Sequence, residues 1–193
     1  NRDHEPGLLG VVADIVKVDK EYEIAVETAL GGSIQNIVTD NEETAKRMIQ
    51  FLKKNKFGRA TFLPLTSMHG GNGIRNEEAL REPGVIGLAN TLVHVEKKYQ
   101  VLADQLLGKT VVVDHIDHGI AIAKKYRQSL RLVTLEGDLI NPGGSMTGGA
   151  FKNSSNLLSR RREIEEFEKH VVVIKDKIQE IEESVAGIKQ KRT

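Results

Sequence analysis

The feature that most constrains this fold is a regular run of apolar residues near the C-terminal end of the printed sequence. They recur at alternating intervals of three and four residues: Ile164, Phe167, Val171, Ile174, Ile178, Ile181, Val185 and Ile188. This spacing marks the a and d positions of a heptad repeat, and Glu, Lys and Asp fill most of the other positions. We therefore predict a coiled-coil helix, which at about 1.5 Å per residue would extend roughly 40 Å.

An apolar stripe as narrow as this one has to be covered by a partner. A helix that packs on its own domain usually has a wider apolar face than a and d alone, so the pattern favours a second helix over folding back. Folding back stays open as the alternative. Only residues 1–6 precede the first globular pattern, too few to supply the second helix. Because the sequence begins with Asn1 rather than methionine, we expect the chain to be a piece of a longer protein.

The rest of the chain contains an internal repeat. Residues 17–32 align with residues 94–109, with five matched pairs: Val18 and Val95, Tyr22 and Tyr99, Ile24 and Val101, Leu30 and Leu107, Gly31 and Gly108. Each half has the pattern helix, strand, helix, strand, and an Asp or Asn precedes each second helix as a candidate N-cap. We predict an α/β (α+β) fold made of two similar subdomains.

Composition along the chain sets the predicted boundaries. Residues 66–84 are rich in Gly and Asn and lack periodicity, so they are predicted to be a linker. This places subdomain I at residues 7–65 and subdomain II at residues 85–151. After Phe151 proline is absent and glycine occurs only at position 187, which assigns residues 152–193 to the helical segment.

Residue types exclude several classes of protein. There is no cysteine, which rules out disulfides and thiolate metal sites and fits a reducing compartment such as the cytoplasm. No apolar run approaches the roughly 20 residues of a membrane span, so no membrane partner is expected. The 28 Lys and Arg nearly balance the 27 Asp and Glu, so only local charge clusters can indicate partners.

Residues 136–151 are dense in glycine, including Gly143, Gly144, Gly148 and Gly149. A phosphate-binding P-loop would need Lys and Ser or Thr after the last of these glycines, where Ala150 and Phe151 stand. A nucleophile elbow around Ser145 would need glycine where Thr147 stands. No catalytic triad or carboxylate pair is recognisable elsewhere. We therefore predict neither enzymatic activity nor a cofactor within this segment.

Two histidines, His115 and His118, alternate with acids in the sequence DHIDHG. Imidazole and carboxylate groups can bind zinc or manganese, but no third ligand stands at motif spacing. The more ordinary interpretation is an aspartate cap with exposed histidines, and we predict no metal site.

Basic side chains form several clusters. One cluster comprises Lys53, Lys54, Lys56 and Arg59, and another comprises Arg160, Arg161 and Arg162. Runs of charge are most often solvated faces. A solvated face explains the arginine triplet less well, because the triplet precedes a Glu-rich helix and the first turn of a helix favours acidic residues. Such clusters can bind a phosphate backbone without reading its sequence.

These features together resemble the hinge domain of SMC (structural maintenance of chromosomes) proteins of the bacterial type. The resemblance rests on the tandem halves, on the segment GDLINPGGSMTGGAFKNSSNLLSRRREIEE and on the heptad helix that follows it. It implies a hinge in the middle of a long chain, with residues 1–6 as the remnant of an incoming arm. That arm and residues 152–193 would form an antiparallel coiled coil, and distant ATPase heads would lie outside this segment.

The resemblance also assigns roles to the clusters. It implies a homodimer in which Gly143, Gly144, Gly148 and Gly149 lie where strands of two chains meet. It implies weak, non-specific DNA binding near the junction with the coil by Lys53, Lys54, Lys56, Arg160, Arg161 and Arg162. A cytoplasmic, nucleoid-associated protein is expected. The alternative is a purely structural dimerisation module whose basic residues contact no DNA.

Overall fold

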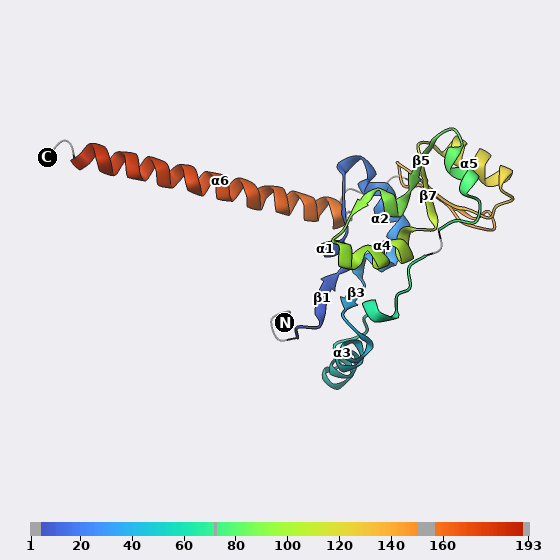
Figure 1. The fold of residues 1–193 in the computed structure, drawn as a ribbon, viewed down its shortest axis with the longest axis horizontal. Helices are drawn as coiled ribbons and strands as arrows, with labels where there is room; N and C mark the ends of the chain where they lie inside the picture. The colour runs from blue at the N-terminus through green and yellow to red at the C-terminus, as the bar shows by residue number, and fades with distance from the viewer. Residues whose placement is uncertain (1–4, 72, 150–156, 191–193) are drawn as a thin grey trace. The chain divides into compact units, whose positions relative to one another are not determined.

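The computed structural model describes residues 5–71, 73–149 and 157–190, and for the last segment it describes side chains as far as Val185. The chain forms two compact units, Asn1–Leu158 and Ser159–Thr193. Figure 1 shows the mixed α/β elements of the first unit and the long helix to which the second belongs. Within the described residues, no helix is long and apolar enough to cross a membrane.

The first half of the globular unit is built on a three-stranded sheet of order β1-β3-β4. Its strands are β1 (Leu8–Val11), β3 (Ile37–Thr39) and β4 (Phe62–Pro64). Strand β3 runs antiparallel to β1 and parallel to β4, and helix α3 (Glu42–Asn55) connects β3 to β4. The side chain of Asn41 caps α3 by accepting a hydrogen bond from the Thr44 N–H at 3.0 Å, as predicted.

The second half contains a five-stranded sheet of order β10-β9-β8-β7-β5. Its strands are β5 (Val85–Leu88), β7 (Thr110–Val113), β8 (Arg131–Thr134), β9 (Leu139–Ile140) and β10 (Met146–Thr147). Helix α5 (Ile116–Lys125) connects the parallel strands β7 and β8. The predicted aspartate cap of α5 is wrong: His115 is the N-cap residue, and no side chain caps the helix. The Asp114 carboxylate accepts a hydrogen bond from the His115 N–H instead, at 2.6 Å.

The internal repeat is confirmed by matching elements in the two halves. Strand β2 (Lys17–Val18) and helix α2 (Glu23–Leu30) correspond to strand β6 (Val93–His94) and helix α4 (Gln100–Leu107). The two short strands pair with each other in an antiparallel manner, so equivalent parts of the repeat lie side by side. The α/β fold with two similar halves was therefore predicted correctly.

The remaining short elements connect and cover these sheets. Helix α1 (Val12–Ile15) follows β1, and six 3-10 segments complete the order: η2 (Lys20–Tyr22), η3 (Gly31–Gln35), η4 (Leu65–Ser67), η5 (Glu77–Arg81), η6 (Ala89–Thr91) and η7 (Lys97–Tyr99). Two of them, η4 and η5, lie in the segment predicted as a linker. That segment is partly packed, since Ala79 is fully buried and Met68 is 7% exposed. The predicted boundaries at residues 66 and 84 stay a prediction.

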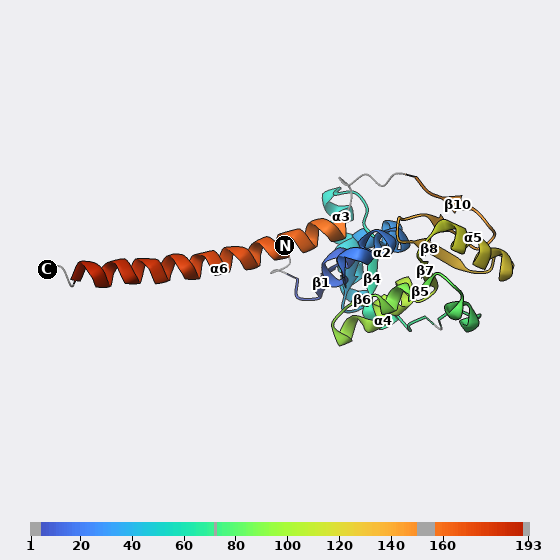
Figure 2. The ribbon, with the colours of Figure 1, turned by 90° about the horizontal axis from the view of Figure 1, so that it is seen from above.

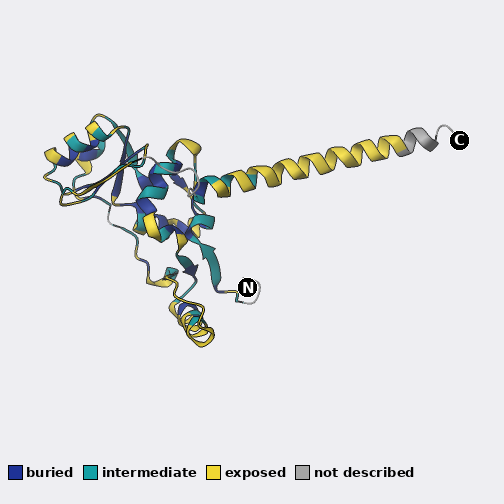
Figure 3. Cartoon of the chain, turned by 180° about the vertical axis from the view of Figure 1, so that it is seen from behind, coloured by how far each residue is buried: buried dark blue, intermediate teal, exposed yellow. Residues whose placement is uncertain are grey.

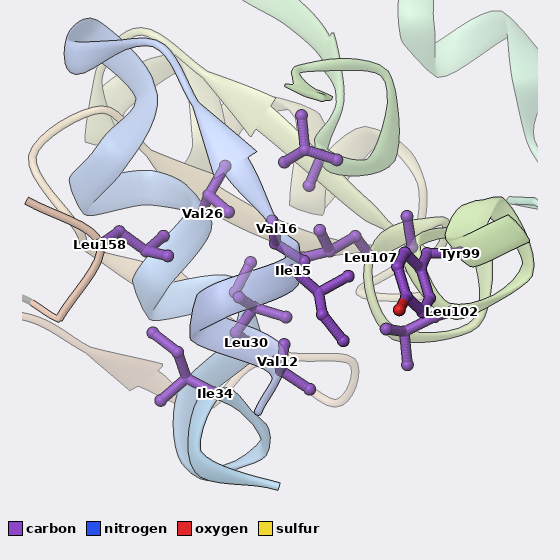
Figure 4. Packing of buried hydrophobic residues seen from close by; sticks show 14 of the residues in the cluster. Val12, Ile15, Val16, Val26, Leu30, Ile34, Tyr99, Leu102, Leu107 and Leu158 are labelled. Atoms are coloured by element: carbon purple, nitrogen blue, oxygen red, sulfur yellow. The ribbon is translucent and has the colours of Figure 1, made fainter. Parts of the chain in front are cut away.

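The largest hydrophobic cluster draws on both halves of the repeat. Val12, Val26 and Leu30 from the first half lie near Leu102 and Leu107 from the second (Figure 4). Fully burying an aliphatic side chain of this kind contributes about 1.5–3 kcal/mol, so the halves stabilise each other. A second cluster, which includes Val111, Ile122 and Leu132, lies within the second half alone.

Helix α6 (Leu157–Gln190) begins inside the globular unit. Leu158 is 3% exposed and belongs to the larger core cluster. The carboxylate of Glu27 accepts hydrogen bonds from the N–H groups of Leu157 and Leu158, at 3.1 and 3.2 Å. A distant acid thus satisfies donors that the first turn of a helix leaves open.

From Glu166 to Val185, every side chain of α6 is exposed (Figure 3). The predicted stripe is helical, and its residues are far from buried: Phe167 is 66% exposed, Ile174 55% and Ile181 63%. The long helix is therefore confirmed, whereas its predicted partner is not among the described residues. Residues 1–4 of the predicted incoming arm and residues 152–156 of the helical segment lie outside the described ranges.

Candidate dimer edge and nucleic-acid surface

A tight turn joins β9 to β10. The Gly144 N–H donates to the Asn141 carbonyl at 2.9 Å, and Pro142 and Gly143 occupy the two central positions between them. Gly143 has φ of 89°, the value that a type II turn requires at its third residue, where a side chain would be strained. This glycine therefore has a role within its own chain.

The turn is anchored to the residues that follow helix α5. The Gly143 N–H donates to the Gln128 carbonyl at 2.9 Å. Gln128 and its neighbour Arg127 both adopt left-handed backbone angles, with φ of 56° and 53°, which non-glycine residues seldom adopt. Strain of this kind persists only where the surroundings hold it in place. Gln128 thus positions the hairpin, and no sequence motif pointed to it.

Beyond the turn, the backbone of β10 lies close to its own domain. A Cβ atom at Gly148 would collide with the carboxylate of Asp138, which accepts a hydrogen bond from the Thr134 hydroxyl at 3.1 Å. Gly149 has open space around it. The structure thus brings all four predicted glycines together on one hairpin and its C-terminal extension. Their contact with a second chain stays a prediction.

The edge strands of the two sheets differ in the regularity of their register, which affects whether they can pair with a strand of another chain. Strands β1 and β5 each carry an irregularity in register, a device that discourages pairing with another chain. At the opposite ends, β4 and β10 pair regularly with their single neighbours. Figure 2 labels both strands. Met146 on β10 is 52% exposed.

The alternation of the β9–β10 ladder shows which backbone groups face outward. The Asn141 N–H donates to the Ser145 carbonyl at 2.9 Å, and Met146 lies opposite Ile140 at the next position. In an antiparallel ladder, bonded and non-bonded pairs alternate, so the N–H and C=O of Met146 point away from β9. They are available to an additional strand.

The predicted lysine cluster lies at the C-terminal end of α3. Lys53 and Lys54 belong to the last turn of the helix, and Lys56 follows it in a left-handed conformation with φ of 55°. All three are exposed, and none has an ion-pair partner among the described residues. Phe57, which is 66% exposed, contacts the Phe51 ring edge-on at 5.8 Å between centroids. The surface thus combines unpaired cations with exposed aromatic rings.

The predicted arginine cluster lies in the other compact unit. Arg160, Arg161 and Arg162 belong to α6, and Arg162 forms an ion pair with Glu166 at 2.8 Å. The lysine and arginine clusters belong to units that are not placed relative to one another. Each is therefore a separate candidate surface.

A model of the family described as "SMC proteins Flexible Hinge Domain" matches residues 5–123 of the chain. The chain belongs to the SMC hinge domain family. The family predicted from the sequence is thereby confirmed. The matched residues include the equivalent helices α2 and α4 and most of the larger core cluster.

Curated relatives of this hinge are much longer proteins. The chromosome partition protein Smc of Desulfitobacterium hafniense is 45% identical over 161 residues, which cover 83% of this chain and 13% of that protein. The protein of the same description from Bacillus subtilis is 40% identical over 95% of this chain and 16% of its own length. The hinge thus spans about one seventh of such relatives.

Solved structures agree with this assignment. A crystal structure of an asymmetric dimer of the Geobacillus stearothermophilus SMC hinge domain matches with a TM-score of 0.80 and 39% identity, covering 96% of this chain and 76% of that one. The Pyrococcus furiosus SMC hinge domain matches with a TM-score of 0.64 and 32% identity, covering 77% of this chain and 76% of that one.

The histidines of the hinge take part in a local contact. His118 Nδ1 lies 2.7 Å from Asp114 Oδ1, and this contact holds the pKa of the Asp114 carboxyl below its usual value. Gly84 leaves room for the pair, because a side chain there would collide with His118. Within the described ranges, no three His, Asp or Glu side chains gather as metal ligands.

Proposed function

We propose that this hinge is the homodimerisation module of an SMC chromosome condensation and segregation protein. The observation that carries the proposal is the pair of regular, open strand edges at β4 and β10. In the second half of the repeat, β9 and β10 extend the sheet beyond β8, whereas β4, the counterpart of β8, has no such neighbour among the described residues. A partner's β10 added to β4 would supply the missing strand, and the reciprocal contact would close a symmetric dimer.

The neighbouring structures support this proposal. The Geobacillus stearothermophilus hinge was crystallised as an asymmetric dimer, and one Pyrococcus furiosus hinge carries an extended coiled coil. By analogy, the glycine-rich hairpin meets the partner chain, and α6 pairs with an antiparallel arm of the same full-length polypeptide. ATPase heads would lie outside this segment, which itself needs no cofactor. Such a protein would act in the cytoplasm, on the nucleoid.

The hinge is expected to have twice the mass of one 21.4 kDa chain in solution at micromolar concentration. Light scattering coupled to size exclusion measures this directly. A specific interface of standard size, about 1,600 Å² in total, is sufficient for a stable dimer. A single-chain mass throughout the accessible concentration range would contradict the proposed function.

Weak, non-sequence-specific DNA binding is the second part of the proposal. It rests on the unpaired cations at the end of α3, with the arginines of α6 as a separate contribution. Lysines that meet phosphates bind through counterion release and read no bases. The exposed Phe57 ring adds a surface on which an unstacked base can lie, so single strands are the more informative probe.

Replacing Lys53, Lys54 and Lys56 with glutamate is expected to weaken DNA binding about 10-fold or more for every sequence. Charged contacts to phosphates contribute about 1.5 kcal/mol or more in total at moderate salt, which corresponds to that factor. The measurement is a gel-shift titration of single-stranded and duplex DNA at several salt concentrations. A matched control reverses three exposed lysines elsewhere on the globular unit: Lys20, Lys97 and Lys124.

Two outcomes separate the lysine surface from its alternatives. If the control loses as much affinity as the cluster variant, net charge alone explains binding and the cluster is no site. If the unchanged hinge binds no DNA even at low salt, the purely structural dimerisation module is the correct description. The dimer should persist in both variants, since the lysines lie outside β4 and β10.

A further inference from the structure

A cavity of about 770 Å³ opens beside the second sheet, and its lining residues are distinct from the lysine cluster of α3. Its walls come from residues 73–76, from the starts of β7 and β8, and from Pro142 of the hairpin turn. The volume lies in the range of small-molecule sites, roughly 300–1,000 Å³. All of its lining belongs to the globular unit.

The lining carries three positive charges and no acid. Arg75, Lys109 and Arg131 contribute the charges, and neither aspartate nor glutamate is among the lining residues. Within the described part of the chain, Arg75 and Lys109 have no hydrogen-bonding or ion-pair partner. Three cations that line one cavity without a carboxylate repel one another, and an anion bound in the cavity would relieve that repulsion.

Arg131 is the fixed member of this group. Its guanidinium donates to the Ala29 carbonyl at 3.0 Å and to the Thr110 hydroxyl at 3.2 Å, which leaves further N–H donors uncommitted. Burial lowers the pKa of Arg131 from its usual value, and no carboxylate among the described residues counteracts this shift. The protein therefore holds a partly desolvated cation at the cavity wall.

The other lining groups narrow the chemical class of the ligand. Asn76 donates to the Ser129 hydroxyl at 3.2 Å, so an amide and a hydroxyl stand beside the cations. Ile74 and Leu130, which are 8% and 4% exposed, form an apolar part of the wall with Pro142. Donors and cations suit phosphate oxygens, and the apolar part suits a sugar or base.

We propose that this cavity binds the phosphate of a nucleotide through Arg75, Lys109 and Arg131. Two sources share this chemistry: a free nucleoside polyphosphate, and a nucleotide within a DNA strand. The site differs in position and residues from the lysine surface of α3.

The test uses the whole hinge chain with three probes: pyrophosphate, ATP and a labelled oligothymidine. The variant is Arg75→Gln with Lys109→Gln, at two exposed positions where loss of charge leaves the core intact. A matched control carries Lys20→Gln with Arg81→Gln, also exposed and without ion pairs in the described structure. Calorimetry measures pyrophosphate and ATP, and fluorescence anisotropy measures the oligonucleotide.

The double variant is expected to lose affinity about 100-fold, because it removes two charged contacts to the phosphate and each is worth about 10-fold. The control should lose almost none. Loss for ATP and pyrophosphate identifies a free nucleotide as the ligand, and loss for the oligonucleotide alone identifies a DNA strand. Competition between ATP and the oligonucleotide would show that both sources use the same cavity.

The inference is overturned if none of the three probes binds more weakly to the variant than to the control. It is equally overturned if the unchanged hinge binds none of them at low salt. Loss of DNA binding in the lysine-to-glutamate variant of α3, with binding of all three probes unchanged in Arg75→Gln with Lys109→Gln, would leave the proposed DNA surface intact and remove this cavity alone.

Discussion

A hinge carrying Met146→Pro is expected to be a folded monomer at concentrations where the unchanged hinge is a dimer. Proline removes the N–H that points away from β9 and leaves the pairs on either side within the hairpin. In a symmetric dimer the loss occurs twice. At about 1 kcal/mol for each hydrogen bond, the dissociation constant rises about 30-fold, and steric conflict with the ring adds to this.

Met146→Val is the matched control, because valine keeps the donor and favours extended backbone. Light scattering over a concentration series gives the dissociation constants, and circular dichroism reports whether the variants are folded. Replacing a glycine would be a poorer test. The turn requires the positive φ of Gly143, and a side chain at position 148 would collide with Asp138. If the proline variant dimerises as tightly as the valine variant, β10 is not the contact.

Adding the segment that precedes this hinge in its full-length protein is expected to raise the melting temperature by about 10 °C and to increase helicity. The exposed stripe of α6 would gain a partner, and partial burial of its apolar side chains contributes more than the ordering of the added arm costs. A net gain of about 3 kcal/mol in a chain of this size corresponds to such a shift.

The same extended chain with Phe167→Ser and Ile174→Ser provides the control for this prediction. Both residues belong to the stripe and are more than half exposed in α6, so their loss should cost the isolated helix little. In the extended chain the two substitutions should abolish most of the gain. An equal gain with and without the stripe would mean that the added arm stabilises the hinge by another route.

Local patterns predicted the elements of this fold well. Heptad spacing identified α6 without any tertiary information, because the apolar residues on one face of a helix recur at fixed intervals of three and four in the sequence. Likewise, the alignment of Tyr22 with Tyr99 and of Leu30 with Leu107 identified the repeat, since both copies pack equivalent positions against one shared core.

The functional surfaces were harder to predict, because they depend on contacts between distant residues. Glycine density located the hairpin, but sequence alone could not separate the turn at Gly143 from a contact with a second chain. Gln128 supports that turn through its backbone carbonyl. Because every residue has this group, the identity of the side chain at position 128 could not reveal the contact. The cavity of Arg75, Lys109 and Arg131 joins residues that no motif spacing connects.

The pairing of β10 with a partner's β4 is the central claim, and the absence of cysteine from the chain allows a direct test. Met146→Cys chains are mixed with chains that carry Thr61→Cys, at the exposed residue directly before β4. The mixture is treated with a short bis-maleimide, and covalent dimers are measured on denaturing gels. Adjacent paired strands lie about 5 Å apart, within reach of such a reagent. The account predicts covalent dimers in this mixture and few when Lys20→Cys replaces Thr61→Cys. Equal yields from the two mixtures would contradict it.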